Sequence, residues 1–286
     1  MAVYRSYTTQ ELENLHKIQL EIMCEIDAIC QKNNIEYVLD SGTALGAARH
    51  KGFIPWDDDM DISMMRENYD RFIAVCKDAL PENLLLYNYE SCDNQAGLFA
   101  KICMKGTKFY TAETVQARFD QGIFVDIFPI DALSSNAQVA TKQLRKCKFW
   151  QSVSYLYASS HIVVPHKGFI GNFEKLIAKL AHAILNLFFT RRQIVANFNK
   201  WAKMANAQSS TPDTQVAAMS YTSCVYKKSC WENCDSAPFE GRKFPIASNV
   251  NDYLEVLYGK NWREFPPEEK RRNHAPTVLQ FPHQPT

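Results

Sequence analysis

Four aspartates stand within five consecutive positions just after Pro55-Trp56, and this run constrains the chain more than any other feature. They are Asp57, Asp58, Asp59 and Asp61. Carboxylates this close repel one another and resist burial unless a cation lies among them. Their oxygens are the ligands that a divalent ion such as Mg²⁺ prefers. The run therefore predicts a metal site in an ordered part of the fold.

The spacing of the run predicts how its side chains point. Asp59-Met60-Asp61-Ile62 alternates polar and apolar residues, as a strand with one wet face does. Asp59 and Asp61 should therefore share a face. Asp57 and Asp58 lie in the turn before the strand and reach the metal only if that turn curls back.

The residues before the run predict a site for phosphate. Residues 37–39 are typical of a short buried strand, and Ser41-Gly42-Thr43 of the cap of a short helix that Gly52 ends. A helix N-terminus offers unpaired amides and a partial positive charge, which favour an anion. We therefore expect Gly42 and Thr43 to hold phosphate close to the metal.

A second strand supplies one more carboxylate. Residues 123–128 are apolar except for Asp126, and a buried charge is costly unless it is paired. Asp126 is therefore the expected third ligand beside Asp59 and Asp61. Asp131 follows Pro129 near a predicted loop, so we interpret it as a cap or turn residue.

The stretch from Ser41 to Ile62 resembles the signature of the LicD family of phosphotransferases, which belongs to the nucleotidyltransferase-fold superfamily. Residues 66–69, 125–131 and 253–267 are also similar to that family. The resemblance implies an α+β fold, with a nucleotidyltransferase-like mixed sheet flanked by helices and an added, mostly helical region. It also implies that Asp59, Asp61 and Asp126 bind Mg²⁺, or Mn²⁺ in its place, and are the catalytic residues.

The resemblance further implies a reaction. Members of the family typically transfer a phospho-alcohol such as phosphocholine from CDP-choline or another CDP-alcohol to a sugar of a surface glycan, and CMP leaves. The expected acceptor is a lipopolysaccharide, a capsular polysaccharide or a lipid-linked oligosaccharide, and Asp126 would assist deprotonation of its hydroxyl. The alternatives are a nucleotidyltransferase that releases pyrophosphate and a binding protein without turnover. An EF-hand fails, because Ile62 and Asn68 stand where its glycine and glutamate are needed.

Further residues are candidates for substrate binding beside Asp57 and Asp58. Arg49 and His50 end the short helix, either as cations favoured by its dipole or as ligands of the donor diphosphate. Lys101 lies in a predicted strand, where most lysines face water. Trp56 belongs to the core, or it stacks on a nucleobase or a choline group.

The chain is expected to have three parts. Residues 1–135 form the catalytic core, residues 136–210 a helical region, and residues 211–286 a segment that completes the site. We predict helices over residues 11–33, 66–80 and 250–258, and a hairpin turn at Lys105-Gly106-Thr107. The basic helical region is either solvated or touches a membrane. The basic residues 268–274 either reach a phosphate or form a solvated tail, and we favour the solvated tail.

Composition limits which partners and which cellular compartment we expect for this chain. A net charge of +1 disfavours a general nucleic-acid binder. The first ten residues lack the apolar core of a signal peptide, and the longest apolar run, residues 176–189, is too short and too polar to span a bilayer. We therefore expect a cytoplasmic protein that acts in solution or at the inner face of the membrane.

Overall fold

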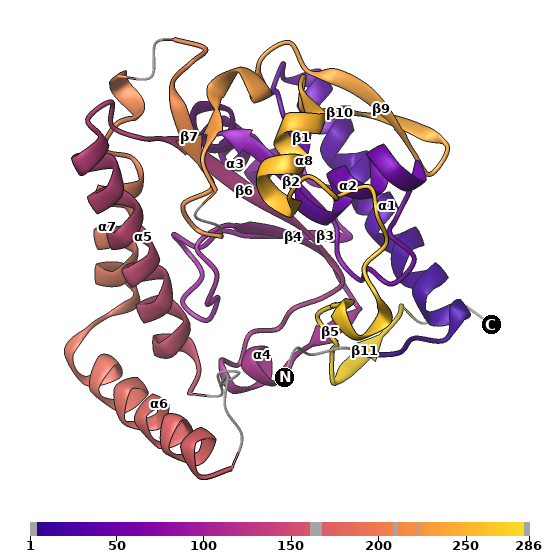
Figure 1. Cartoon of the computed structure of the whole chain (residues 1–286). Helices are drawn as coiled ribbons and strands as arrows, with labels where there is room; N and C mark the ends of the chain where they lie inside the picture. Colours follow the sequence, from indigo (N-terminus) through magenta and orange to yellow (C-terminus); the bar gives the residue numbers. More distant parts are fainter. Residues whose placement is uncertain (1–4, 161–167, 209–210, 222–223, 283–286) are drawn as a thin grey trace.

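A computed structural model describes residues 5–160, 168–208, 211–221 and 224–282. Its centre is a seven-stranded mixed sheet in the order β1-β2-β6-β4-β3, extended at the far end of β6 by β7 and β8 (Figure 1). The strands are β1 (Val38–Leu39), β2 (Asp61–Met65), β3 (Leu84–Tyr87), β4 (Ala100–Met104), β6 (Phe124–Ala132), β7 (Gln215–Ala217) and β8 (Tyr226–Lys227). The β2–β6 pair is parallel, and the other pairs are antiparallel. The expected mixed sheet flanked by helices is confirmed.

Two amphipathic helices cover one face of the sheet. α1 (Thr9–Lys32) contacts β4 and β6, α3 (Arg66–Ala79) contacts β2 and β6, and the two helices touch each other. α1 begins in a capping box between Thr8 and Glu11, which satisfies two amides that would otherwise be unpaired. The apolar stripe of α1 packs into the core, as its period predicts.

The short helix before the aspartates differs from its prediction at both ends. α2 (Ser41–His50) starts after Asp40, whose carboxylate accepts a hydrogen bond from the Ser41 amide at 2.6 Å. It ends at Lys51 in the left-handed conformation, with φ of 59°, so Gly52 is not the stop. Gly52 instead leaves room for the Glu240 side chain, since a Cβ there would stand 2.1 Å from its Oε1, which accepts a hydrogen bond from the Phe53 amide. The strand also starts later than predicted, at Asp61 instead of Asp59.

The predicted hairpin at residues 105–107 is wrong. β5 (Lys108–Tyr110) pairs with β11 (Val278–Gln280) near the C-terminus, and α4 (Ala112–Gln116) follows β5. The physical reason is that β4 already pairs with β3 on one edge and with β6 on the other. No edge of β4 is left for β5, so the chain turns away at Gly106, which has φ of 75°.

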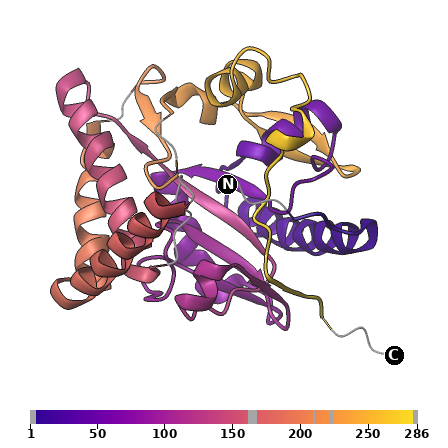
Figure 2. The same cartoon turned by 60° about the horizontal axis from the view of Figure 1, so that its bottom comes forward.

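The middle of the chain is helical, as predicted. α5 (Ala137–Ala158) packs against α6 (Gly168–Phe188) and α7 (Arg191–Ala202) at one end of the molecule (Figures 1 and 2). Residues 161–167 and 209–210 of the predicted helical region lie outside the described residues. Among the helices that the structure describes, none combines the length and the apolar character needed to cross a membrane.

The last part of the chain returns to the core. After β7 and β8, the hairpin of β9 (Asp235–Phe239) and β10 (Arg242–Ile246) leads into α8 (Val250–Tyr258). This helix ends at Gly259, as predicted. Short 3₁₀ helices lie at Asn206–Gln208, Lys228–Trp231 and Glu268–Lys270.

Asp131 is not a cap or a turn residue. It lies in β6, fully buried, and both of its oxygens accept hydrogen bonds from Arg66 at 2.8 and 2.6 Å. Asn206 donates a third bond at 2.7 Å. The buried guanidinium at the start of α3 compensates a charge that no local sequence pattern pairs with it.

Candidate active site

Two neighbouring strands hold the central pair of carboxylates. Asp61 on β2 lies in register with Asp126 on the parallel strand β6. The amide of Asp126 donates a hydrogen bond to the carbonyl of Met60 at 2.9 Å. Because residues in register on adjacent strands present their side chains on the same face, the two carboxylates stand side by side.

The surrounding protein groups do not balance the charges of these carboxylates or satisfy all of their oxygens. Burial, reinforced by the charges of Asp59 and Asp126, raises the pKa of Asp61 well above its usual range. Burial and the Asp59 carboxylate do the same to the pKa of Asp57. Oδ1 of Asp61 is buried and has no hydrogen-bond partner among the residues that the structure describes. These oxygens therefore fit a hard divalent cation such as Mg²⁺, which would satisfy Oδ1 and relieve the repulsion.

Lys101 compensates part of this negative charge. Its Nζ lies 2.5 Å from Oδ1 of Asp126 and 3.7 Å from the centre of the Phe124 ring. Burial raises the pKa of Asp126, and the Lys101 ammonium opposes that rise. Lys101 is thus a buried partner of a predicted metal ligand and does not face water.

The start of α2 supports the aspartate turn. The Asp61 amide donates a hydrogen bond to Oγ1 of Thr43 at 2.8 Å, so this hydroxyl is occupied by β2. Gly42 lies against Asp57, because a Cβ at Gly42 would stand 2.6 Å from Oδ2 of that carboxylate. Of the two residues predicted to hold phosphate, only Gly42 lines the adjoining cavity.

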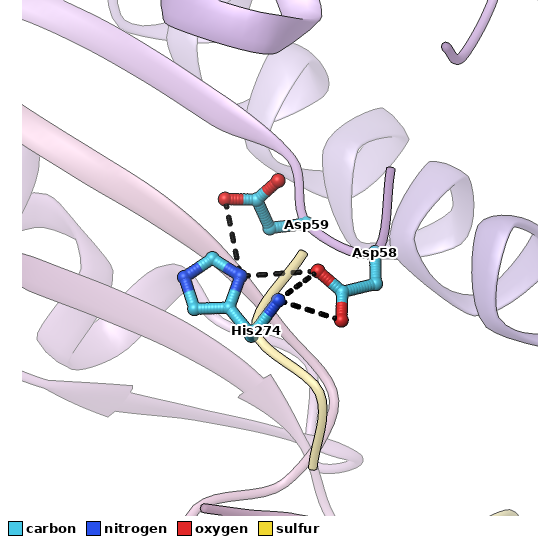
Figure 3. A group of neighbouring side chains, drawn as sticks. All are labelled: Asp58, Asp59 and His274. Carbon is cyan, nitrogen blue, oxygen red and sulfur yellow. Dashed lines mark hydrogen bonds and ion pairs between the residues drawn. The ribbon is translucent and has the colours of Figure 1, made fainter. Parts of the chain in front are cut away.

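Asp58 holds the two ends of the chain together. It is fully buried, with 0% exposure, and its oxygens accept bonds from the Tyr7 hydroxyl at 2.6 Å and from the amides of His274 and Ala275 at 2.8 to 3.2 Å (Figure 3). Although burial opposes the charge, the hydrogen bonds from His274 and Tyr7 lower the pKa of Asp58. Asp58 does not line the cavity, so the structure does not bring it to the place where a substrate would bind.

His274 lies between Asp58 and Asp59 (Figure 3). Its Nδ1 is 3.1 Å from Oδ1 of Asp58 and 3.6 Å from Oδ2 of Asp59, and its side chain is 43% exposed. The three residues have ligand atoms within 4.8 Å of one another. Desolvation opposes protonation, but the carboxylates of Asp59 and Asp58 outweigh it and raise the pKa of His274 to about 9. At neutral pH and without a metal ion, His274 is therefore a cation paired with carboxylates, and a metal bound at these three residues would have to displace its proton.

A cavity of about 780 Å³ opens beside the carboxylates. Asp57, Asp59 and Asp61 line its acidic part. The remaining wall is cationic and aromatic, and its side chains come from α2, the turn before β2, the loop after β7, α8 and the C-terminal tail: Arg49, Trp56, Tyr221, Tyr258, Trp262, Phe265, Lys270, Arg271 and Arg272. The interpretation of residues 268–274 as a solvated tail is therefore wrong for the residues from Lys270 to His274, which form a wall of this cavity.

Arg49 and His50, the predicted binding residues at the end of α2, differ in their position relative to the cavity. Arg49 lines the cavity and donates hydrogen bonds from one terminal nitrogen to the carbonyls of Trp262 and Glu264, each at 3.0 Å. His50 accepts a bond from Nε of Arg49 at 3.0 Å and lies outside the cavity lining. Desolvation and the Arg49 charge lower the pKa of His50, so neutral His50 positions Arg49.

Trp56 lines the cavity, but the face of its ring towards the C-terminal tail is already covered. The guanidinium of Arg271 lies 4.3 Å from the centre of its ring. A cation already stacks on Trp56, as the electrostatics of an indole face favour. The rings of Tyr221 and Tyr258, which are 51% and 43% exposed, line the same cavity as Asp57, Asp59 and Asp61.

Comparison with known proteins agrees with this arrangement. Residues 34–167 match the protein family described as LicD/FKTN/FKRP, nucleotidyltransferase domain. The chain carries a LicD-family domain.

Individual relatives extend the similarity beyond that domain. A protein named lipopolysaccharide cholinephosphotransferase LicD, from Haemophilus influenzae, is 26% identical over 276 residues, which cover 89% of this chain and 92% of the relative. An uncharacterized protein of Rickettsia prowazekii is 26% identical over 173 residues, 54% of this chain and 62% of that protein. One from Rickettsia typhi is 44% identical over 74 residues, 26% of this chain and 23% of its own length.

The LicD-family domain contains the carboxylates but not the whole cavity. The matched region ends at residue 167, whereas Tyr221, Tyr258 and the tail that carries Arg271 and His274 come later in the chain. The C-terminal part therefore contributes a wall of the cavity.

A second cavity, of about 630 Å³, lies against the other side of the carboxylates of the LicD-family domain. Asp126 and Lys101 line it, together with the aromatic rings of Phe99, Phe119, Phe124 and Tyr155. Asn273 and His274 line both cavities. The tail therefore separates two spaces that meet next to the paired strands β2 and β6.

Sequence reasoning missed several residues of this site. His274 and Tyr7, which bind Asp58, are far from it in the sequence, and no local pattern connects them. The cluster of basic residues after Pro266-Pro267 was a usable signal for the cavity wall. The aromatic residues Tyr258, Trp262 and Phe265 among them were another, because binding surfaces combine rings with arginines.

Proposed function

We propose that this protein transfers phosphocholine, or a closely related phospho-alcohol, from a CDP-linked donor to a sugar hydroxyl of a surface glycan, and that CMP is released. The observation that carries this proposal is the cavity with carboxylates at one end and Arg49, Lys270, Arg271 and Arg272 around the remainder. A CDP-alcohol has a diphosphate that suits arginines, and the phosphorus that carries the alcohol must lie near the metal ligands. The name of the Haemophilus influenzae relative, a lipopolysaccharide cholinephosphotransferase, supports the same reaction.

The two cavities suggest places for the two substrates. The donor occupies the larger cavity, where Gly42 and the cationic wall contact its diphosphate and the exposed rings of Tyr221 and Tyr258 face its trimethylammonium group. The acceptor sugar enters the second cavity, whose lining includes Asp126. A lipopolysaccharide is the acceptor that the relative's name favours.

The proposed reaction is an in-line displacement at the phosphorus that carries choline. The sugar oxygen forms a new bond to that phosphorus, the bond to the CMP oxygen breaks, and Asp126 accepts the hydroxyl proton. Lys101 holds the Asp126 carboxylate in place through its 2.5 Å contact. Mg²⁺ held by Asp59, Asp61 and Asp126 would neutralise phosphate oxygens and stabilise the leaving group.

Donor turnover tests this function. The protein is incubated with Mg²⁺ and, separately, CDP-choline, CDP-glycerol, CDP-ribitol, CDP-ethanolamine and ATP, in each case with lipopolysaccharide that lacks phosphocholine. CMP release with phosphocholine on the glycan is expected from CDP-choline. Pyrophosphate release from ATP would instead favour a nucleotidyltransferase. Donor binding without any product, unchanged by Asp126→Asn, would favour a binding protein.

A further inference from the structure

Helix α6 presents a continuous apolar face to solvent. Eight large apolar side chains on it are 50% to 77% exposed: Ile170, Phe173, Leu176, Ile177, Leu180, Ile184, Leu187 and Phe188. At 3.6 residues per turn they fall on one side of the helix, along its whole length. An exposed patch of this size usually marks a binding surface.

The other side of α6 fixes its orientation. Ala178 is buried against the protein, and Nδ1 of His182 lies 2.8 Å from the carbonyl of Leu156 in α5. Asn186 donates a bond to the carbonyl of Tyr157 at 3.0 Å. α6 is therefore attached to α5 by its small and polar residues at the edge of the molecule (Figure 1), and the apolar face is directed outward.

The charge beside this face is positive. Within the described side chains of α6, the exposed charged residues are Lys175 and Lys179. By helical spacing Lys175 is in line with His182 on the attached side, whereas Lys179 lies between Asn186 and the edge of the apolar face at Leu176. Helices α5, α6 and α7 together carry nine lysines and arginines and one glutamate, the half-buried Glu174. An apolar stripe on a cationic helical region is complementary to a lipid surface with anionic headgroups.

We propose that α6 docks this protein on an anionic membrane surface, lying in the plane of the interface with its apolar face among the acyl chains. The helix is roughly 31 Å long at about 1.5 Å per residue, and it lacks the continuous apolar character needed to span the bilayer. The apolar side chains supply burial, and Lys179 contacts the headgroups while the other cations of the helical region add long-range attraction. This surface goes beyond the proposed transfer reaction and does not depend on it, although a lipid-anchored glycan would be presented at such a surface.

Vesicle sedimentation of the full-length protein tests this docking. We expect the protein to sediment with vesicles of phosphatidylcholine and phosphatidylglycerol, and more weakly with phosphatidylcholine alone or at high salt. Leu176→Gln with Leu180→Gln should lower the partition coefficient by about tenfold or more for each side chain. Lys179→Gln should lower it by about fivefold on anionic vesicles only. Val256→Gln, at an exposed apolar position on α8, is the matched control and should sediment like the wild type.

Two results would overturn the proposal. One is equal sedimentation of the wild type and the Leu176→Gln, Leu180→Gln variant, with circular dichroism showing that both are folded. The other is a wild-type protein that does not bind anionic vesicles but forms dimers that the same double substitution dissociates, because a second copy would then cover the apolar face. The assay contains no donor and no glycan, so its outcome is separate from failure of the transferase activity.

Discussion

At the scale of single residues, Asp61 gives the clearest indication of a cation site. Its Oδ1 is buried and unpartnered among the described residues, and burial together with the charges of four other aspartates raises its pKa. Thr43 supports its backbone, so the residue is held rigidly. A protein that places a carboxylate in this way gains stability when a cation binds there.

We predict that Mg²⁺ raises the melting temperature of the wild type and that Asp61→Asn removes this rise. At a hundredfold excess over its dissociation constant, a bound ion adds about 2.7 kcal/mol to the free energy of unfolding. Without metal, Asp61→Asn should melt at the same temperature or higher, because it removes a repelling charge. Scanning calorimetry in Mg²⁺ and in EDTA measures both effects, with exposed Asp78→Asn as the control. An unchanged Mg²⁺ response in Asp61→Asn would contradict a metal at this carboxylate.

Tyr258 should decide donor selectivity. Its exposed ring lines the donor cavity, and a quaternary ammonium on an aromatic face is worth about 0.5 to 2 kcal/mol. Tyr258→Leu is therefore expected to raise KM for CDP-choline about tenfold, with little effect on KM for uncharged CDP-glycerol. Tyr258→Phe keeps the ring and should behave like the wild type. Equal losses for both donors would place the choline group elsewhere.

At the scale of elements, the C-terminal tail is a wall of the site. β11 pairs with β5, Asp58 binds the backbone of His274 and Ala275, and Arg5 donates a bond to the Pro276 carbonyl at 3.0 Å. The tail therefore closes over the turn that carries the aspartates. Its cationic residues reach the cavity only while these contacts hold.

Asp58→Ala should release the tail while the sheet stays folded. The substitution removes the acceptor of four hydrogen bonds from Tyr7, His274 and Ala275, so the tail loses its anchor. We expect faster trypsin cleavage at Arg271 and Arg272 and a KM for the donor raised about tenfold or more, since each lost arginine contact costs more than 1 kcal/mol. Mass spectrometry of the fragments identifies the cleavage sites, and Asp78→Ala is the control. Unchanged cleavage would mean that β11 alone holds the tail.

The anchor of the tail should also depend on pH. His274 has a pKa of about 9 in the folded protein, above its usual 6.5, because Asp59 and Asp58 favour its charge against desolvation. The contribution of protonated His274 to the free energy of unfolding is therefore complete below pH 6.5 and is lost as the pH rises through about 9. Trypsin cleavage of the tail in EDTA should accelerate over this range relative to an unstructured peptide substrate. In His274→Gln the relative rate should be constant.

At the scale of the whole molecule, the first and last predicted segments share one sheet, and the helical segment between them packs beside it. β7 and β8, from the last segment, extend the sheet that residues 38–132 begin, and α5 and α7 pack against each other. Buried polar contacts also join distant parts, because Asp131 forms an ion pair with Arg66 and accepts a hydrogen bond from Asn206. The core and the C-terminal segment are therefore expected to unfold as one cooperative unit.

Coincident denaturation curves test this cooperativity. Urea unfolding should have the same midpoint by far-ultraviolet circular dichroism and by tryptophan fluorescence, because Trp56, Trp150, Trp201, Trp231 and Trp262 are distributed over all three segments. Asp131→Ala leaves the Arg66 charge buried without its partner and should lower both midpoints together, at a cost of about 3 to 5 kcal/mol. Two separate transitions would show independent domains.

Local patterns in the sequence were sufficient for most elements. The period of α1 and α3, the Gly259 end of α8 and the apolar run of β6 each depend on residues a few positions apart. The pairing of Asp61 with Asp126 was also predictable, because a lone aspartate in an apolar strand needs a partner. Local chemistry alone did not exclude the hairpin after β4, since Lys105-Gly106-Thr107 is a good turn whatever strand follows it.

The sequence by itself determined that the chain forms a mixed sheet with helices and that its aspartates gather on two strands, because periodicity and the cost of burying charge act over short distances. Only the tertiary structure decided what surrounds those aspartates: Lys101 on Asp126, His274 between Asp58 and Asp59, and the tail as a cavity wall. These contacts join residues up to 216 positions apart. Such long-range contacts depend on which strand edges remain free and which buried charges still lack a partner once the chain has folded.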